Sequence, residues 1–137
     1  MIQIGVVSLK NMQMWGGKIV ITLFPYYNVQ NHHYAYKARP ALIMAGYPLS
    51  DEEFLVLPIA TLKRREFYSP QFDYCLSLQL CHQLGLHEQC FIRCHKQTTI
   101  NKAMIGQILG DLKQVDAHVY KEVVQLMREY DTIKLKL

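Results

Sequence analysis

Short β-rich apolar runs, followed by one amphipathic helix near the end, form the pattern that most constrains the fold of this chain. Residues 18–24, 41–45 and 54–59 are rich in aliphatic and aromatic side chains, which is typical of β-strands. Pro25 is expected to end the first run, because proline cannot donate a hydrogen bond to a β-ladder. Residues 26–38 are polar and aromatic without a helical period, and they predict a long loop.

Weaker strand patterns follow in the second half of the chain. After a predicted turn at 47–53, residues 72–78 and 90–96 alternate loosely in the manner of strands. Asn101 is expected to cap a brief helical turn, because its side chain can accept hydrogen bonds from free backbone amides. Residues 105–112 are then predicted to be extended, so that roughly five or six strands are expected in all.

One helix is predicted clearly, near the end of the chain. Asp116 is a candidate N-cap, and apolar residues follow it at helical spacing. These residues are Val119, Val123, Leu126, Met127 and Tyr130. The tail at 133–137 alternates like a short strand or frays. A mainly β fold, with a small, strongly bent antiparallel sheet and a C-terminal helix packed on it, satisfies this order of elements.

Length and charge set broad limits on the function. The 137 residues fit a single domain, residues 1–137. The net charge of +4 leans weakly toward polyanionic partners. No apolar run approaches the roughly 20 residues that a membrane span needs, and the first residues do not resemble a signal peptide. We therefore expect a cytoplasmic protein without a membrane partner.

Possible metal ligands are concentrated between residues 75 and 95. Four cysteines and three histidines in this stretch are of the types that bind zinc. However, there is no Cys-x-x-Cys pair, and the spacings match none of the usual structural zinc patterns. Disulfides are rare in the cytoplasm. Free thiols and no metal site are therefore predicted, with zinc as the less favoured alternative. The residues concerned are Cys75, Cys81, His82, His87, Cys90, Cys94 and His95.

Five short segments occur in a characteristic order along the chain. They are Gly17-Lys18-Ile19-Val20 leading to Phe24-Pro25, Lys37-Ala38-Arg39-Pro40-Ala41-Leu42-Ile43, Leu57-Pro58-Ile59-Ala60-Thr61, residues 92–100, and Ile105-Gly106 leading to Asp111-Leu112. This series resembles the PemK/MazF family of toxins from bacterial toxin–antitoxin pairs, with residues 1–15 outside the resemblance as an N-terminal extension. A lone Arg-Pro pair would be uninformative, whereas five ordered segments at family-like spacing are specific.

The resemblance implies both a fold and an activity. The fold is a small SH3-like barrel of antiparallel strands with a C-terminal helix, working as a homodimer. The activity is cleavage of single-stranded RNA without a metal or cofactor, by attack of the ribose 2′-hydroxyl on the neighbouring phosphate. The implied partner is an antitoxin whose flexible segment occupies the RNA groove. Because the same fold hosts toxins with other targets, notably DNA gyrase, a non-catalytic toxin is the first alternative. An SH3-like module that binds nucleic acid or peptide is the second.

Two catalytic residues follow from the resemblance. The arginine of the family motif corresponds to Arg39, whose guanidinium is permanently charged and suits stabilisation of a crowded phosphate. Action as a general base would require an exceptional environment. The catalytic hydroxyl of the family falls on Ala60 or Thr61, and alternation along a strand decides which of the two enters the groove. Thr61 is the preferred candidate, because it keeps the hydroxyl.

Polar residues that contact RNA in the family correspond to His95, Lys96 and Gln97. An imidazole such as that of His95 titrates near neutrality and can exchange protons with substrate. The plainer interpretation is a hydrogen-bonded bystander. Lys96 is the better candidate for a phosphate contact.

Further RNA contacts are predicted in the polar connections. Lys37 accompanies Arg39, and Lys63 and Arg64 directly follow the third strand. These two residues either line the groove or lie in a solvated turn. Tyr34 belongs to an aromatic stretch at 26–36. It is a candidate for base stacking, with a dimer interface or a cover for the barrel mouth as the alternative.

Overall fold

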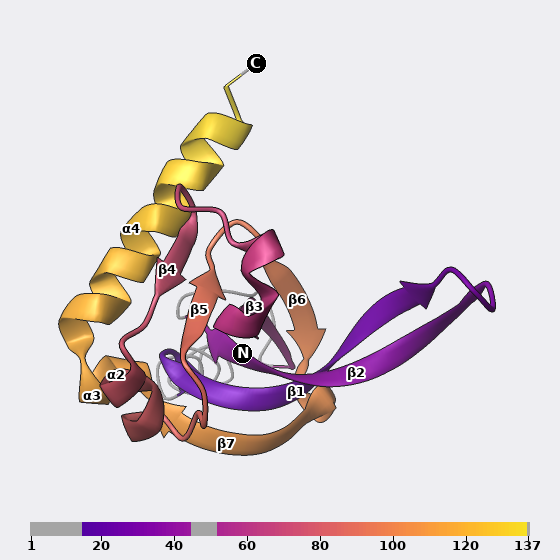
Figure 1. Cartoon of the computed structure of the whole chain (residues 1–137), viewed down its shortest axis with the longest axis horizontal. Helices are drawn as coiled ribbons and strands as arrows, with labels where there is room; N and C mark the ends of the chain where they lie inside the picture. Colours follow the sequence, from indigo (N-terminus) through magenta and orange to yellow (C-terminus); the bar gives the residue numbers. More distant parts are fainter. Residues whose placement is uncertain (1–14, 45–51, 137) are drawn as a thin grey trace, which may run out of the picture.

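A computed structural model describes residues 15–44 and 52–136 of the chain. Within these residues a bent antiparallel sheet packs against the helix α4 (Ala117–Lys134), which runs along one side of the molecule (Figure 1). The predicted sheet with a C-terminal helix is confirmed. The N-terminal extension before Trp15 and most of the predicted turn at 47–53 lie outside the described residues. In the described ranges, no helix combines the length and the apolar character needed to cross a membrane.

Seven strands of the described chain form the sheet, in the order β4-β5-β3-β2-β1-β7, and β6 pairs with β3 off this path. All pairs are antiparallel. The strands are β1 (Lys18–Asn28), β2 (His33–Ile43), β3 (Glu53–Thr61), β4 (Asp73–Cys75), β5 (Cys90–Arg93), β6 (Thr98–Asn101) and β7 (Ile105–Asp111). Because β4 and β7 stand at opposite ends of this order and do not pair within the described residues, the barrel-like sheet that was expected is present as an open, bent sheet.

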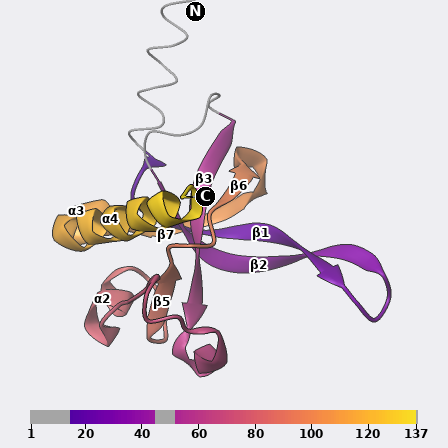
Figure 2. The same cartoon turned by 90° about the horizontal axis from the view of Figure 1, so that it is seen from above.

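The β1–β2 hairpin is the largest departure from the prediction. The loop predicted at 26–38 is wrong, because both strands continue through most of it and pair in regular register up to Asn28 and His33. Pro25 does not end β1. It pairs with Tyr36 of β2, in a part of β1 that no longer pairs with β7. Because β1 has only one neighbouring strand there, the missing N–H of proline removes no hydrogen bond to a second strand. The outer half of the hairpin therefore projects from the body as a two-stranded arm (Figures 1 and 2).

Two helical segments begin at the capping side chains that the sequence predicted. Asn101 Oδ1 accepts a hydrogen bond from the N–H of Ala103, which confirms the predicted capped turn. Asp116 Oδ1 accepts from the N–H of Val119 and caps α4, also as predicted. Because α4 continues to Lys134, the strand proposed for the tail is wrong over its first two residues. The other helical segments are η1 (Leu62–Phe67), α2 (Leu78–Gln83), η2 (Lys102–Met104) and α3 (Leu112–Val115).

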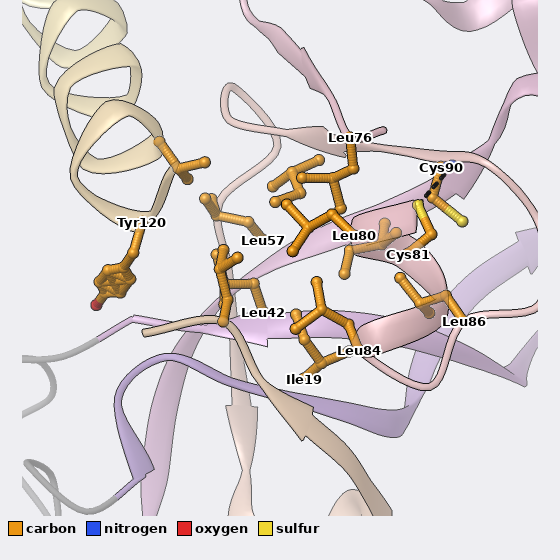
Figure 3. Packing of buried hydrophobic residues seen from close by; sticks show 14 of the residues in the cluster. Ile19, Leu42, Leu57, Leu76, Leu80, Cys81, Leu84, Leu86, Cys90 and Tyr120 are labelled. Carbon is orange, nitrogen blue, oxygen red and sulfur yellow. Dashed lines mark hydrogen bonds between the residues drawn. The ribbon is translucent and has the colours of Figure 1, made fainter. Parts of the chain in front are cut away.

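The strands bury side chains on both faces of the sheet. On one face Ile19, Leu42 and Leu57 join the larger core cluster, which packs against α2 and α4 (Figure 3). On the other face, alternate residues such as Val20 and Ala41 form a second, smaller cluster. Beyond these clusters, the side chains of β1, β2 and β3 continue to alternate between the two faces of the sheet. The two cavities described below therefore open on opposite faces.

The cysteines are free thiols, as predicted. Cys81, Cys90 and Cys94 are buried in the larger cluster, whereas Cys75 is exposed. Burial raises the pKa of Cys90 and of Cys94 to about 12. Among residues 15–44 and 52–136, no three His, Cys, Asp or Glu side chains gather closely enough to hold a metal ion.

Candidate functional site

The register of the central strands brings Arg39 and Ala60 to one face of the sheet. Ala41 pairs directly with Pro58, and paired residues of an antiparallel ladder point to the same side. Arg39 and Ala60 lie two residues from this pair, and therefore also face that side. This is the face of the smaller core cluster.

The next strand adds a second arginine to the same face. Ala60 pairs with Phe91 of β5, and Arg93 follows Phe91 by two residues. The side chains of β2, β3 and β5 thus converge where the sheet bends, and the turn after β5 contributes Lys96.

A cavity of about 330 Å³ opens at this point. Its described lining residues are Phe24, Arg39, Pro58, Ile59, Ala60, Arg93 and Lys96. Three of these are cations, none is acidic, and the rest supply an apolar floor. Two guanidinium groups and an ammonium around a small hollow suit a phosphate group, because guanidinium groups donate paired hydrogen bonds to its oxygens.

Arg93 was not predicted as a site residue. Its position on the third strand of the face depends on the pairing of β3 with β5, which joins segments about 30 residues apart in the sequence. The alternation at 90–96 already placed Phe91, Arg93 and His95 on one side, and that was the available signal.

Behind the cavity, Arg93 meets a buried carboxylate. Asp73 Oδ1 lies 3.5 Å from Arg93 Nε, and the Asp73 side chain has no exposed surface. Asp73 Oδ2 accepts a hydrogen bond of 2.6 Å from the backbone N–H of Ser69. Because a buried carboxylate is costly unless it is paired, Asp73 and Arg93 stabilise each other's position.

His95 lies beside this pair and is not among the residues that line the cavity. Its Nδ1 is 3.5 Å from Asp73 Oδ1, and its Nε2 is 3.4 Å from Arg93 Nη2. The ring packs against Phe72 and Tyr130. Burial lowers the pKa of His95 below its usual value. The charges of Arg93 and Lys96 lower the pKa further, while Asp73 opposes them. The imidazole is therefore neutral at physiological pH.

Arg39 and Thr61 are not brought together. Thr61 lines a different cavity, of about 500 Å³, together with Ile21 and Pro40 of the opposite face. Ala60 takes the place beside Arg39. The two candidates for the catalytic hydroxyl position thus lie on opposite faces, and the residue at the cationic cavity has no hydroxyl.

The remaining predicted RNA contacts are dispersed. Gln97 Nε2 donates to Asp131 Oδ1 of α4 at 2.8 Å, and Lys63 pairs with Glu88 at 2.6 Å. Lys37 is exposed on the arm, on the same side as Arg39. Tyr34 points to the opposite side and makes an edge contact with the Tyr27 ring. Arg64 lies in η1.

The fold defines a class of small proteins in which an open, bent antiparallel sheet packs on a C-terminal helix, and in this chain the sheet also carries the cationic hollow. A solved structure of this class is the toxin MazF-mt6 of Mycobacterium tuberculosis, with a TM-score of 0.54 and 17% sequence identity over 82% of this chain and 96% of the toxin. At this identity the likeness shows a shared fold. No protein-family model matches the chain, and no curated protein sequence matches it.

Proposed function

We propose that this protein is the toxin of a toxin–antitoxin pair and acts as an endoribonuclease on single-stranded RNA, without a metal or cofactor. The observation that carries the proposal is the hollow lined by Arg39, Arg93 and Lys96 on a MazF-like fold. Three cations around a hollow of about 330 Å³ suit a single phosphodiester, and the apolar floor suits the edge of a sugar or base.

The cations act on the charge that develops during cleavage. The ribose 2′-oxygen attacks the adjacent phosphorus, and the bond from phosphorus to the 5′-oxygen breaks. The 2′-hydroxyl proton passes to solvent, and the departing 5′-oxygen takes up a proton. The products are a 2′,3′-cyclic phosphate and a 5′-hydroxyl. Arg39 and Arg93 stabilise the extra negative charge on the phosphate oxygens, an effect typically worth 10²–10³ in rate for one donor, or about 3–4 kcal/mol.

The proposal includes the partners of the protein, which are the RNA backbone, an antitoxin and a second copy of the chain. Lys37, on the Arg39 side of the arm, continues the cationic path for the RNA backbone. A cognate antitoxin would block the cavity with an acidic, flexible segment. By analogy with toxins of this fold, the working unit is a homodimer in the cytoplasm.

One observation favours a second candidate function, a toxin that binds its target without cleaving it. The residue beside Arg39 is Ala60, and among the described residues neither a hydroxyl, a carboxylate nor an imidazole lines the cavity. Such a cavity can bind an anionic partner, and Lys96 is the one described lining side chain that could transfer a proton. Thr61 stays a predicted catalytic residue only if it acts from the other face of the sheet.

Incubation of the purified protein with defined single-stranded RNA in excess chelator separates the two candidates. We expect cleavage with cyclic phosphate ends, and a fall of about 10²–10³ in rate for Arg39→Ala. The matched control is Lys121→Ala, which removes an exposed cation of α4 that does not line the cavity. Thr61→Ala tests the remaining hydroxyl. RNA binding without cleavage in the wild type would favour the non-catalytic toxin. Equal rates for Arg39→Ala and the control would reject the assigned site.

A further inference from the structure

Three polar side chains from different parts of the chain meet behind the cationic cavity. Asp73 comes from β4, Arg93 from the end of β5, and His95 from the turn that follows. Arg93 is the only one of the three among the lining residues described for the cavity. Asp73 is fully buried and His95 is half-buried, and both contact Arg93.

The contact with Arg93 indicates which tautomer the neutral imidazole of His95 adopts. An arginine N–H can only donate, so His95 Nε2 must accept at its 3.4 Å contact with Arg93 Nη2. The single proton of the neutral ring then sits on Nδ1, 3.5 Å from Asp73 Oδ1, at a distance where the two atoms attract each other without forming a hydrogen bond. In this arrangement the neutral ring holds Arg93 on one side and Asp73 holds it on the other.

We propose that Asp73 and neutral His95 are positioning residues that hold the Arg93 guanidinium at the cavity, and that protonation of His95 loosens it. A protonated ring has no lone pair on Nε2 and cannot accept from Arg93. Its positive charge would stand 3.4 Å from the guanidinium and compete with it for the same carboxylate oxygen. For the proposed ribonuclease, on which this consequence rests, cleavage then slows at acid pH.

Among the charged and titratable groups that face one another around His95, its own imidazole is the group that changes charge near neutral pH. Asp73 faces it from β4, Arg93 from β5, Lys96 from the turn, and Tyr130 from α4. The nearby thiol of Cys94 stays neutral, because burial raises its pKa to about 12. Of the side chains in this set, histidine is the type whose usual pKa lies closest to physiological pH. Burial lowers the pKa of His95, so the transition falls on the acid side of the usual value of about 6.5.

The positioning is tested without any activity, by an NMR titration of His95 in the full chain. The chain has six histidines, and His95→Gln identifies the signal by its loss. We expect Arg93→Gln to raise the midpoint and Asp73→Asn to lower it, each by about half a pH unit or more. Unchanged midpoints in both variants, or shifts of the opposite sign, overturn the proposal. If Asp73→Asn does not fold, Arg93→Gln decides alone.

The functional consequence is tested by the pH profile of RNA cleavage. We expect kcat to fall roughly ten- to hundredfold on the acid limb, with the midpoint found for His95 by NMR. KM should change less, because Arg39 and Lys96 still bind phosphate. His95→Gln should flatten the limb, and Asp73→Asn should have little further effect in an Arg93→Gln background. An acid limb that persists in His95→Gln overturns the link to cleavage. If the NMR shifts appear and the wild type cleaves no RNA at any pH, the failure belongs to the proposed ribonuclease and the positioning of Arg93 stands.

Discussion

The substitution Gly110→Ala probes the place where β7 crosses the end of α2. A Cβ atom on Gly110 would lie 2.9 Å from the carbonyl oxygen of Leu84, 3.0 Å from its Cα and 3.1 Å from its carbonyl carbon. All three are backbone atoms of a fully buried residue, so they cannot rotate away. On the α2 side of this crossing lies Gly85, which has a φ of +79° and where an added Cβ atom would have equally little room. We expect a cost of about 2 kcal/mol for this overpacking, which corresponds to a fall in Tm of about 8 °C for a domain of this size.

The same strand offers a control. A Cβ atom on Gly106 would meet nothing closer than the carbonyl oxygen of Ile21 at 3.8 Å, which is ordinary van der Waals contact. Gly106→Ala should therefore change stability by less than about 0.5 kcal/mol. Thermal unfolding followed by circular dichroism, with urea unfolding as a second measurement, compares the two variants. If Gly110→Ala melts within a degree or so of Gly106→Ala, β7 and α2 do not approach as closely as the structure has them.

Three further predictions address the cavity and the thiols. Because the pKa of His95 is lowered in the folded state, the unfolded state takes up its proton first. Stability should therefore fall as the pH drops below about 6.5. In His95→Gln this part of the pH dependence should vanish in urea unfolding at pH 7.5 and 5, and an identical dependence in both proteins would contradict it. Ala60→Ser adds a hydroxyl beside Arg39 and should raise the RNA cleavage rate about tenfold if proton transfer limits it, whereas an unchanged rate would mean that charge stabilisation alone sets the rate. With a thiol reagent at pH 8, Cys75 should react quickly and the three buried cysteines only after denaturation; fast reaction of Cys90 or Cys94 would contradict their burial.

The features that the sequence predicted well are local. The caps at Asn101 and Asp116 depend on side chains within three residues of the amides they satisfy. The apolar spacing of α4 likewise repeats over a few residues. The β1–β2 arm was missed because its evidence is not local: tyrosines and a proline suggested a loop, and only pairing with the opposite strand makes them strand residues.

Only part of the candidate site was predicted, again because some of its residues are brought together by strand pairing and not by a local pattern. Arg39 was found through its own motif. Arg93 becomes a site residue through the pairing of β5 with β3, and through Asp73, whose burial next to Arg93 follows from the pairing of β4 with β5 and not from the loose alternation at 72–78. The uncertainty between Ala60 and Thr61 was a matter of one position along β3. Since side chains alternate, that one position moves a residue from one face of the sheet to the other.

The two arginines of the cavity are held in different ways. A change to acid pH should therefore affect RNA binding and the rate of RNA cleavage to different extents. Arg39 belongs to the continuous β1–β2 ladder, opposite Thr22, whose hydroxyl donates to the carbonyl of Met104. Within the described residues, no hydrogen bond or ion pair joins Arg39 to a titratable side chain, so its place should not depend on pH. Arg93 stands at the end of a four-residue strand and contacts Asp73 and His95. A ligand phosphate at acid pH would therefore still find Arg39 and Lys96, while the second guanidinium would be held less firmly because it loses its contact with neutral His95. Because two guanidinium groups in fixed positions stabilise a developing charge better than one fixed and one mobile, the chemical step should respond to acid more strongly than RNA binding does.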